Sequence, residues 1–245
     1  MTKVNLSDYI VIDIETASEY PSFENMDENL QQLWIEKSGR QLTEEINAAA
    51  FYQMRSGVMA EFAKIVCISI GCFIREESLK LKIKSFYGND EKLLLNNFIQ
   101  TMNNIKRNKW SFAGHNIKEF DIPFICRRML INEIVIPDYL DFQNTKPWEN
   151  NMFDTFHYWR FGDYKNFTSL KLLSKILNVP SSKDDIDGSM VGGLYWEADP
   201  TQQEINLMRI AEYCNKDVAT TANIMLRMTN EILVNEANIS FVKSN

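Results

Sequence analysis

Two carboxylates interrupt an otherwise apolar stretch near the start of the chain. The stretch YIVIDIETAS spans residues 9–18 and contains Asp13 and Glu15. Because they are two residues apart on an expected strand, their side chains project from the same face. Two negative charges so close repel each other unless one is protonated or a divalent cation lies between them. Such oxygen ligands suit Mg²⁺ and Mn²⁺, and the alternative is a strand end whose acids meet solvent.

Two further motifs place acids in apolar surroundings. Asp121 lies between Phe120 and Ile122, just after an expected strand-to-helix turn, where it could bind a metal or act as a helix N-terminal acid. Tyr213 and Asp217 are four residues apart in an expected helix and therefore share one face. Read alone, each of these two motifs is better explained by a structural role than by chemistry.

Together the three motifs resemble those of the DEDD 3′→5′ exonucleases. D-x-E-T at 13–16, N-x-x-x-F-D at 116–121 and Y-x-x-x-D at 213–217 occur in that order, and the tyrosine matches the DEDDy variant. The likeness extends from residue 9 to about residue 225. It is greatest to the proofreading domains of family-B DNA polymerases and their stand-alone relatives. It implies an α/β, ribonuclease H-like fold with a mixed central sheet flanked by helices.

The resemblance also implies roles for individual side chains. Four acids would hold two divalent cations, Mg²⁺ or Mn²⁺, and these acids are Asp13, Glu15, Asp121 and Asp217. Tyr213 would position the attacking water. Positions that contact the terminal nucleotides in the polymerase relatives are matched by Thr16, Asn116, Phe120, Ser169 and Leu170. A lysine assists the chemistry in polymerase proofreading sites, and both Lys165 and Lys171 lie in the matching region.

The resemblance therefore implies a metal-dependent 3′→5′ exonuclease acting on single-stranded nucleic acid, with DNA favoured over RNA, and the chemistry of these residues is consistent with it. Two cations roughly 4 Å apart can clamp the attacking and leaving oxygens of a phosphodiester. Phe120 could stack on an unpaired base, a contact worth about 1–3 kcal/mol. The alternative is a catalytically silent nucleic-acid-binding or scaffold module on the same fold, although the presence of all four acids argues against it. A phosphatase-like hydrolase is a third possibility, but it leaves the motif at Tyr213 unexplained.

Composition and charge limit the class of protein. The 245 residues are 45% hydrophobic and 24% charged, which is typical of a globular domain. The net charge of −7 argues against a broad basic surface for duplex DNA. No apolar run approaches the ~18 residues that a membrane helix needs, and the N-terminus has no signal-peptide pattern. We therefore expect a cytoplasmic protein that does not bind membranes, with its four cysteines reduced and His115 in a structural role.

The elements that must position these residues follow from hydrophobic periodicity. We expect a single exonuclease domain over residues 1–245, with a helical insertion at about 19–62 that has too little apolar content for its own core. A turn-rich loop is expected at 183–193. Strands are predicted at 8–14, 64–74, 79–88 and 110–116, and helices at 89–106, 119–133, 153–160 and 168–180. Residues 201–233 are predicted to be helical throughout, as one helix or two, and the order leaves room for one more short strand. This order predicts the mixed α/β sheet independently of the resemblance.

Overall fold

A six-stranded sheet forms the centre of the protein, in the order β5-β4-β1-β2-β3-β6. The computed structural model describes residues 4–105, 110–143, 145–146, 149–165, 167–180 and 186–242. The strands are β1 Tyr9–Ser18, β2 Ala63–Arg75, β3 Leu79–Tyr87, β4 Ser111–Gly114, β5 Phe153–Asp154 and β6 Ile239–Val242. β1, β2 and β3 are antiparallel, whereas β4 is parallel to β1, β5 to β4 and β6 to β3. The predicted mixed sheet is confirmed.

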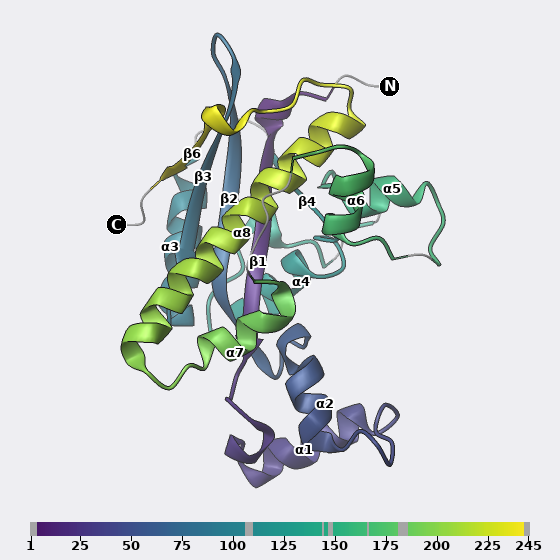
Figure 1. Cartoon of the computed structure of the whole chain (residues 1–245), viewed down its shortest axis with the longest axis vertical. Coiled ribbons are helices and arrows are strands. Elements are labelled where there is room, and N and C mark those ends of the chain that lie inside the picture. The colour runs from purple at the N-terminus through teal and green to yellow at the C-terminus, as the bar shows by residue number, and fades with distance from the viewer. Residues whose placement is uncertain are drawn as a thin grey trace.

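Helices cover both faces of this sheet (Figure 1). α8 crosses one face obliquely, α3 and α4 cover the other, and α5 and α6 lie beside β4. The bounds are α3 Glu91–Asn103, α4 Asp121–Ile131, α5 Thr155–Arg160, α6 Leu170–Ile176, α7 Val191–Tyr195 and α8 Pro200–Met228. The Asp199 carboxylate caps the first turn of α8, where Pro200 supplies a preset backbone angle. α8 is thus a single helix of 29 residues.

Side chains on β1 alternate between two cores. Ile10, Ile12 and Ile14 point into the cluster formed with α3 and α4. Val11 packs in the opposite cluster, which includes Val218 of α8. Because strand side chains alternate, the odd-numbered residues that follow Val11 also face α8. The alternation of β1 therefore directs its two acids toward the long helix.

Residues 19–62 form a lobe at the lower end of the molecule (Figure 1), built on α1 Glu28–Ser38 and α2 Ala48–Arg55. The expectation that this insertion lacks a core was wrong. Buried side chains of the lobe form a cluster of their own, made of Met26, Trp34, Phe51, Tyr52 and Phe62. Four of these are aromatic, and aromatic side chains bury more area per residue than aliphatic ones. A few large aromatic side chains form this core, although the small number of apolar residues predicted that none would form.

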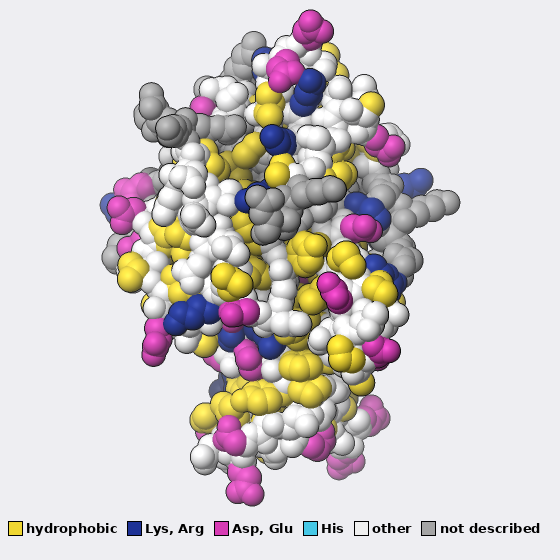
Figure 2. Space-filling view, turned by 90° about the vertical axis from the view of Figure 1, so that its left-hand side faces the viewer, with side chains coloured by type: hydrophobic (Ala, Val, Ile, Leu, Met, Phe, Trp, Pro, Cys, Tyr) yellow, Lys and Arg dark blue, Asp and Glu magenta, His cyan; other side chains and the backbone are white. Residues whose placement is uncertain are grey.

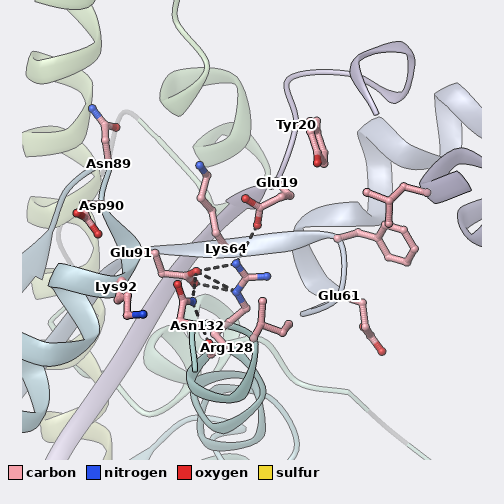
Figure 3. A pocket seen from close by; sticks show the side chains of 13 residues that line it. Glu19, Tyr20, Glu61, Lys64, Asn89, Asp90, Glu91, Lys92, Arg128 and Asn132 are labelled. Atoms are coloured by element: carbon pink, nitrogen blue, oxygen red, sulfur yellow. Dashed lines mark hydrogen bonds and ion pairs between the residues drawn. The ribbon is translucent and has the colours of Figure 1, made fainter. Parts of the chain in front are cut away.

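Charged side chains join the lobe to the body at a cavity of about 730 Å³ (Figure 3). Arg128 of α4 binds the Glu91 carboxylate with Nε and Nη2, at 2.9 and 2.6 Å. Nη2 also donates to Glu19 at 2.8 Å, and Nη1 donates to the Ala60 carbonyl at 2.9 Å. Asn132 donates to Glu91 as well. We call Glu19, Glu91, Arg128 and Asn132 the arginine cluster.

Two expectations near the C-terminus were wrong. The loop predicted at 183–193 contains the short helix α7 at its end, because Val191 and Tyr195 lie one turn apart and pack against α8. Residues 183–185 of that loop lie outside the described residues. The helix predicted to reach residue 233 ends at Met228, and the chain then returns as β6, which pairs with β3 and agrees with the further short strand expected after the helices.

Acidic, basic and apolar side chains are interspersed on the face shown in Figure 2. The described part of that face carries no extended basic surface, which agrees with the net charge of −7. Within the described residues, no helix has the length and apolar character needed to cross a bilayer.

Candidate active site

β1 carries Asp13 and Glu15 toward α8. Glu15 is 8% exposed, and its carboxylate has no hydrogen-bond partner among the described residues. A β-bulge lies directly after it, since Glu15 is opposite Cys67 but Thr16 is opposite Ile65. Bulges of this kind re-aim side chains and are frequent beside active sites. The register of the β1–β2 pair thus shifts at the point where the second acid is buried, and the pairing continues to Ser18.

Asp121 is attached directly to the same strand. It is the first residue of α4, is 3% exposed, and accepts a hydrogen bond from the backbone amide of Ile14 at 3.1 Å. Burial raises the pKa of Asp121 to about 7, even though this hydrogen bond and one from its own amide lower it. The backbone of β1 therefore holds the third acid beside the first two.

Tyr213 and Asp217 come from α8, on the face that covers β1. Burial raises the pKa of the Tyr213 phenol, and the charges of Asp217, Glu15 and Asp13 raise it further. A hydrogen bond with the Asp217 carboxylate acts in the same direction. Tyr213 therefore remains protonated, and its surroundings show that the acids of β1 and α8 lie within electrostatic reach of one ring.

The four carboxylates act on one another in the same way. Burial raises the pKa of Asp13 well above its ordinary value, and the charges of Asp121, Asp217 and Glu15 add to this. Burial also raises the pKa of Glu15, with Asp217 the next contributor. Among the described residues, none forms an ion pair with Asp13, Glu15 or Asp121. We call Asp13, Glu15, Asp121 and Asp217 the acid cluster.

One member of this site was missed in the sequence. The Cys214 thiol donates to Asp13 Oδ2 at 3.3 Å and lies near the Asp13 carbonyl at 3.4 Å. Asp13, Glu15 and Cys214 each offer a ligand atom within 4.8 Å of the others. The signal was available, because Cys214 precedes Asp217 by three residues and so shares its helix face. Cys214 is a buried free thiol as expected, but it also belongs to the site.

The donor atoms fit a hard divalent cation. Carboxylate oxygens dominate the site, and within the described part of the chain no hydrogen-bond donor reaches the buried Glu15 carboxylate. A buried ionised carboxylate is costly unless it is paired or binds a metal. Oxygen-rich sites of this kind suit Mg²⁺ and Mn²⁺.

Three of the residues expected to contact nucleotides lie next to the acids in the chain. Asn116 adopts a left-handed backbone conformation (φ 66°), and its buried side-chain oxygen has no hydrogen-bond partner among the described residues. Phe120 is half-buried, and its ring centre lies 5.4 Å from that of Phe124. The Thr16 hydroxyl donates to the Gly57 carbonyl at 2.6 Å, so it is engaged by the lobe. Asn116 is thus the member of this group with unused hydrogen-bonding capacity.

The remaining expected contacts lie on or beside α6. Ser169 caps this helix by accepting from the Leu172 amide, and Leu170 packs on a cluster containing Ile224 of α8. Lys165 and Lys171 are both exposed. Within the described residues, no hydrogen bond or ion pair joins any of these four side chains to the acid cluster. Their predicted roles therefore remain predictions.

His115 and Asp154 hold the turn that leads to Asp121. The ring nitrogens of His115 lie 2.9 Å from Thr155 Oγ1 and 3.0 Å from the Thr168 carbonyl, and burial lowers the pKa of His115. The expected structural role of this histidine is confirmed. Asp154 accepts from the Asn116 amide at 2.9 Å and also caps α5. This structural role of Asp154 was not predicted, although an acid just before a helical stretch is a signal for a helix N-cap.

The sheet and its flanking helices form a ribonuclease H-like fold. Among solved structures, the family B DNA polymerase from the hyperthermophilic archaeon Pyrobaculum calidifontis matches with a TM-score of 0.52 and 11% identity. The match covers 94% of this chain and 27% of the polymerase chain. At this identity the likeness concerns the fold alone. A search of curated proteins by sequence found no match.

Sequence comparison with family models adds the activity class. The model described as "Predicted 3'-5' exonuclease related to the exonuclease domain of PolB" matches residues 58–236, and the chain belongs to this family. The matched residues include Asp121, Tyr213 and Asp217. Asp13 and Glu15 precede the match, and β1 brings them to the same site by pairing with β2.

Proposed function

We propose that this chain is a metal-dependent DEDDy exonuclease that removes nucleotides from the 3′ end of single-stranded nucleic acid. The observation that carries this proposal is the convergence of the acid cluster and Tyr213 from β1, α4 and α8. Membership of a family of predicted 3′-5′ exonucleases supports the direction of the reaction. The relation of that family to a DNA polymerase domain favours DNA over RNA as the substrate.

The acid cluster would hold two divalent cations, Mg²⁺ or Mn²⁺. When bound, such cations neutralise phosphodiester charge and lower the pKa of a bound water. The carboxylates fit this role because a cation would relieve their mutual repulsion and burial, and no ion pair among the described residues does so for Asp13, Glu15 or Asp121. An acidic chain can engage a polyanion in this way at a local site.

The other residues bind and orient. Tyr213 stays protonated and donates a hydrogen bond to the Asp217 carboxylate. Its phenol oxygen can therefore accept a hydrogen bond from the attacking water. The unpartnered amide oxygen of Asn116 can accept a hydrogen bond from the terminal nucleotide. Phe120 offers a ring face beside the same turn. Each contact positions the last phosphodiester bond, and none depends on the base sequence.

The test uses 5′-labelled single strands of DNA and RNA with EDTA, Mg²⁺ or Mn²⁺. We expect a ladder that shortens from the 3′ end with metal only. Asp13→Ala should lower turnover about 10³-fold or more, since a cation site supplies several kcal/mol of transition-state stabilisation. Tyr213→Phe should lower turnover about 10²-fold through misplacement of the water. Glu212→Gln, an exposed acid on the same helix, is the matched control and should change turnover less than twofold.

The alternative function is a module that binds nucleic acid without catalytic activity. It would be supported if the wild-type chain bound single strands but shortened none of them with either metal. Asp13→Ala would then bind as the wild type does.

A further inference from the structure

We propose that Tyr164 and Phe167 form a stacking platform for the bases of a single strand, upstream of its 3′ end. They lie in the connection between α5 and α6, which projects from the molecule beside α5 in Figure 1. Tyr164 is 76% exposed and Phe167 is 70% exposed. This inference deepens the proposed function and rests on it.

Both rings contact a common base formed by Phe156 and Arg160. The guanidinium carbon of Arg160 lies 3.9 Å from the ring centre of Phe156 and 5.9 Å from that of Tyr164. The ring centre of Phe167 lies 5.1 Å from that of Phe156. Phe156 itself is fully buried. The platform therefore has a rigid base and two exposed faces.

The base of the platform is fixed to the turn that carries the site residues. Arg160 Nη1 donates to Glu119 at 2.9 Å, and Glu119 lies between Asn116 and Asp121 in the chain. The ring centre of His115 lies 5.6 Å from that of Phe156. Tyr164 and Phe167 are thus anchored to the segment that leads into the acid cluster. A strand whose end reaches that cluster can extend over them.

Charge favours a nucleic acid over an apolar peptide as the occupant. Residues 155–180 contain four basic residues and one acidic residue, a formal charge of +3 in a chain whose net charge is −7. Lys165 and Lys171, both exposed, belong to this segment. Aromatic faces combined with basic side chains bind single strands without sequence preference, because every base has a face to stack. A neutral apolar peptide would gain nothing from the added charge.

Phe161 provides a matched control within the same connection. Its ring is 82% exposed, but its neighbour is Tyr158, at 5.7 Å between ring centres. The Tyr158 hydroxyl donates to the Met228 carbonyl at the end of α8. Phe161 therefore packs on a residue that is held by α8, and not on Phe156 or Arg160. Removing Phe161 deletes an equally exposed aromatic without touching the platform.

The experiment measures binding without turnover, by fluorescence anisotropy of labelled oligothymidylates of 4 and 16 nucleotides in EDTA. The Tyr164→Ala/Phe167→Ala double variant should bind the 16-mer about tenfold or more weakly than wild type, from the loss of one or two stacked bases. Its affinity for the 4-mer and its thermal unfolding should change little. Phe161→Ala should bind both oligomers within twofold of wild type, and Tyr164→Trp/Phe167→Trp should restore 16-mer binding.

Three outcomes would overturn the proposal. In the first, the double variant binds the 16-mer as tightly as wild type. In the second, Phe161→Ala weakens binding of the 16-mer as much as the double variant does. In the third, the double variant abolishes a wild-type dimer seen by size-exclusion chromatography and leaves strand binding intact. The metal-dependent ladder assay separates this failure from failure of the proposed function. A wild-type chain that shortens strands, beside a double variant that binds them normally, contradicts the platform alone. A wild-type chain that neither binds nor shortens strands contradicts both.

Discussion

The acid cluster and the arginine cluster are both groups of buried charge, and they differ in how completely the protein satisfies them. In the arginine cluster, Glu91 accepts hydrogen bonds from Arg128, Asn132 and the Ile65 amide. In the acid cluster, Glu15 has no such donor among the described residues, and Asp121 receives backbone amides only. One group is satisfied within the chain, whereas the other leaves the Glu15 carboxylate without a donor among the described residues, as the proposed cation site would require.

This difference separates a structural role from a chemical one. A buried ion pair with every donor placed holds elements in register, and here it joins α4 to the start of α3 and to the lobe (Figure 3). Buried acids without a basic partner repel each other and weaken the fold unless something binds to them. Acids that destabilise a fold need another reason to be present, and cation binding is such a reason. The comparison predicts opposite effects on stability for changes in the two clusters.

The largest expected effect on stability is the loss of Arg128. Arg128→Met should lower the free energy of unfolding by about 3–5 kcal/mol, because it leaves Glu91 buried without its charge partner. Urea unfolding followed by circular dichroism measures this. Arg127→Met, an exposed arginine next to it on α4, is the control and should change stability by less than about 0.5 kcal/mol. Turnover per folded molecule should stay near that of wild type. A loss below about 1 kcal/mol would mean that the cluster contributes little.

A smaller effect of opposite sign is expected in the acid cluster. Because the folded-state pKa of Asp121 is about 7, the folded protein keeps a proton there that the unfolded chain releases near pH 4. Stability from this group is complete below about pH 4 and is lost as the pH rises toward 7, at up to about 1.4 kcal/mol per pH unit. Asp121→Asn cannot ionise and escapes this loss. In EDTA, its stability relative to wild type should therefore increase between pH 5 and pH 8.

Urea unfolding at four pH values provides this comparison, with the exposed Asp141→Asn as the control. Saturating Mg²⁺ should shrink the advantage of Asp121→Asn, since a cation stabilises the ionised carboxylate of the wild type only. An advantage that is independent of pH, with or without metal, would contradict the view that Asp121 is buried among uncompensated acids.

The four acids were grouped as a predicted site from the sequence, whereas the residues of the arginine cluster were not paired, and the difference has a physical reason. Asp13 and Glu15 are two residues apart on one strand, so local geometry was enough to pair them. Asp121 and Asp217 were joined to them only by the resemblance of the three ordered motifs to the DEDD exonucleases. Arg128 and Glu91 are 37 residues apart on different helices, and no local pattern pairs them. The core of the lobe was missed because it depends on how rings such as Trp34 pack. A further short strand was expected, but the position of β6 was not predicted because a four-residue strand is defined by its partner. The central strands followed directly from periodicity.

The smallest expected effect tests whether burial, rather than ion pairing itself, makes the arginine cluster strong. Lys37 and Glu61 form an ion pair of 2.8 Å within the lobe, but their side chains are 42% and 54% exposed. Exposed pairs are screened by water and salt and are worth about 0–1 kcal/mol. Lys37→Met should therefore lower the free energy of unfolding by less than about 1 kcal/mol, and 0.5 M NaCl should remove most of that difference. The Arg128→Met loss should persist in the same salt, because its partners are shielded from solvent. If both losses fell together as salt was added, the contrast between the buried and exposed pairs would be wrong, and the arginine cluster would have to be reached by water through the cavity beside it.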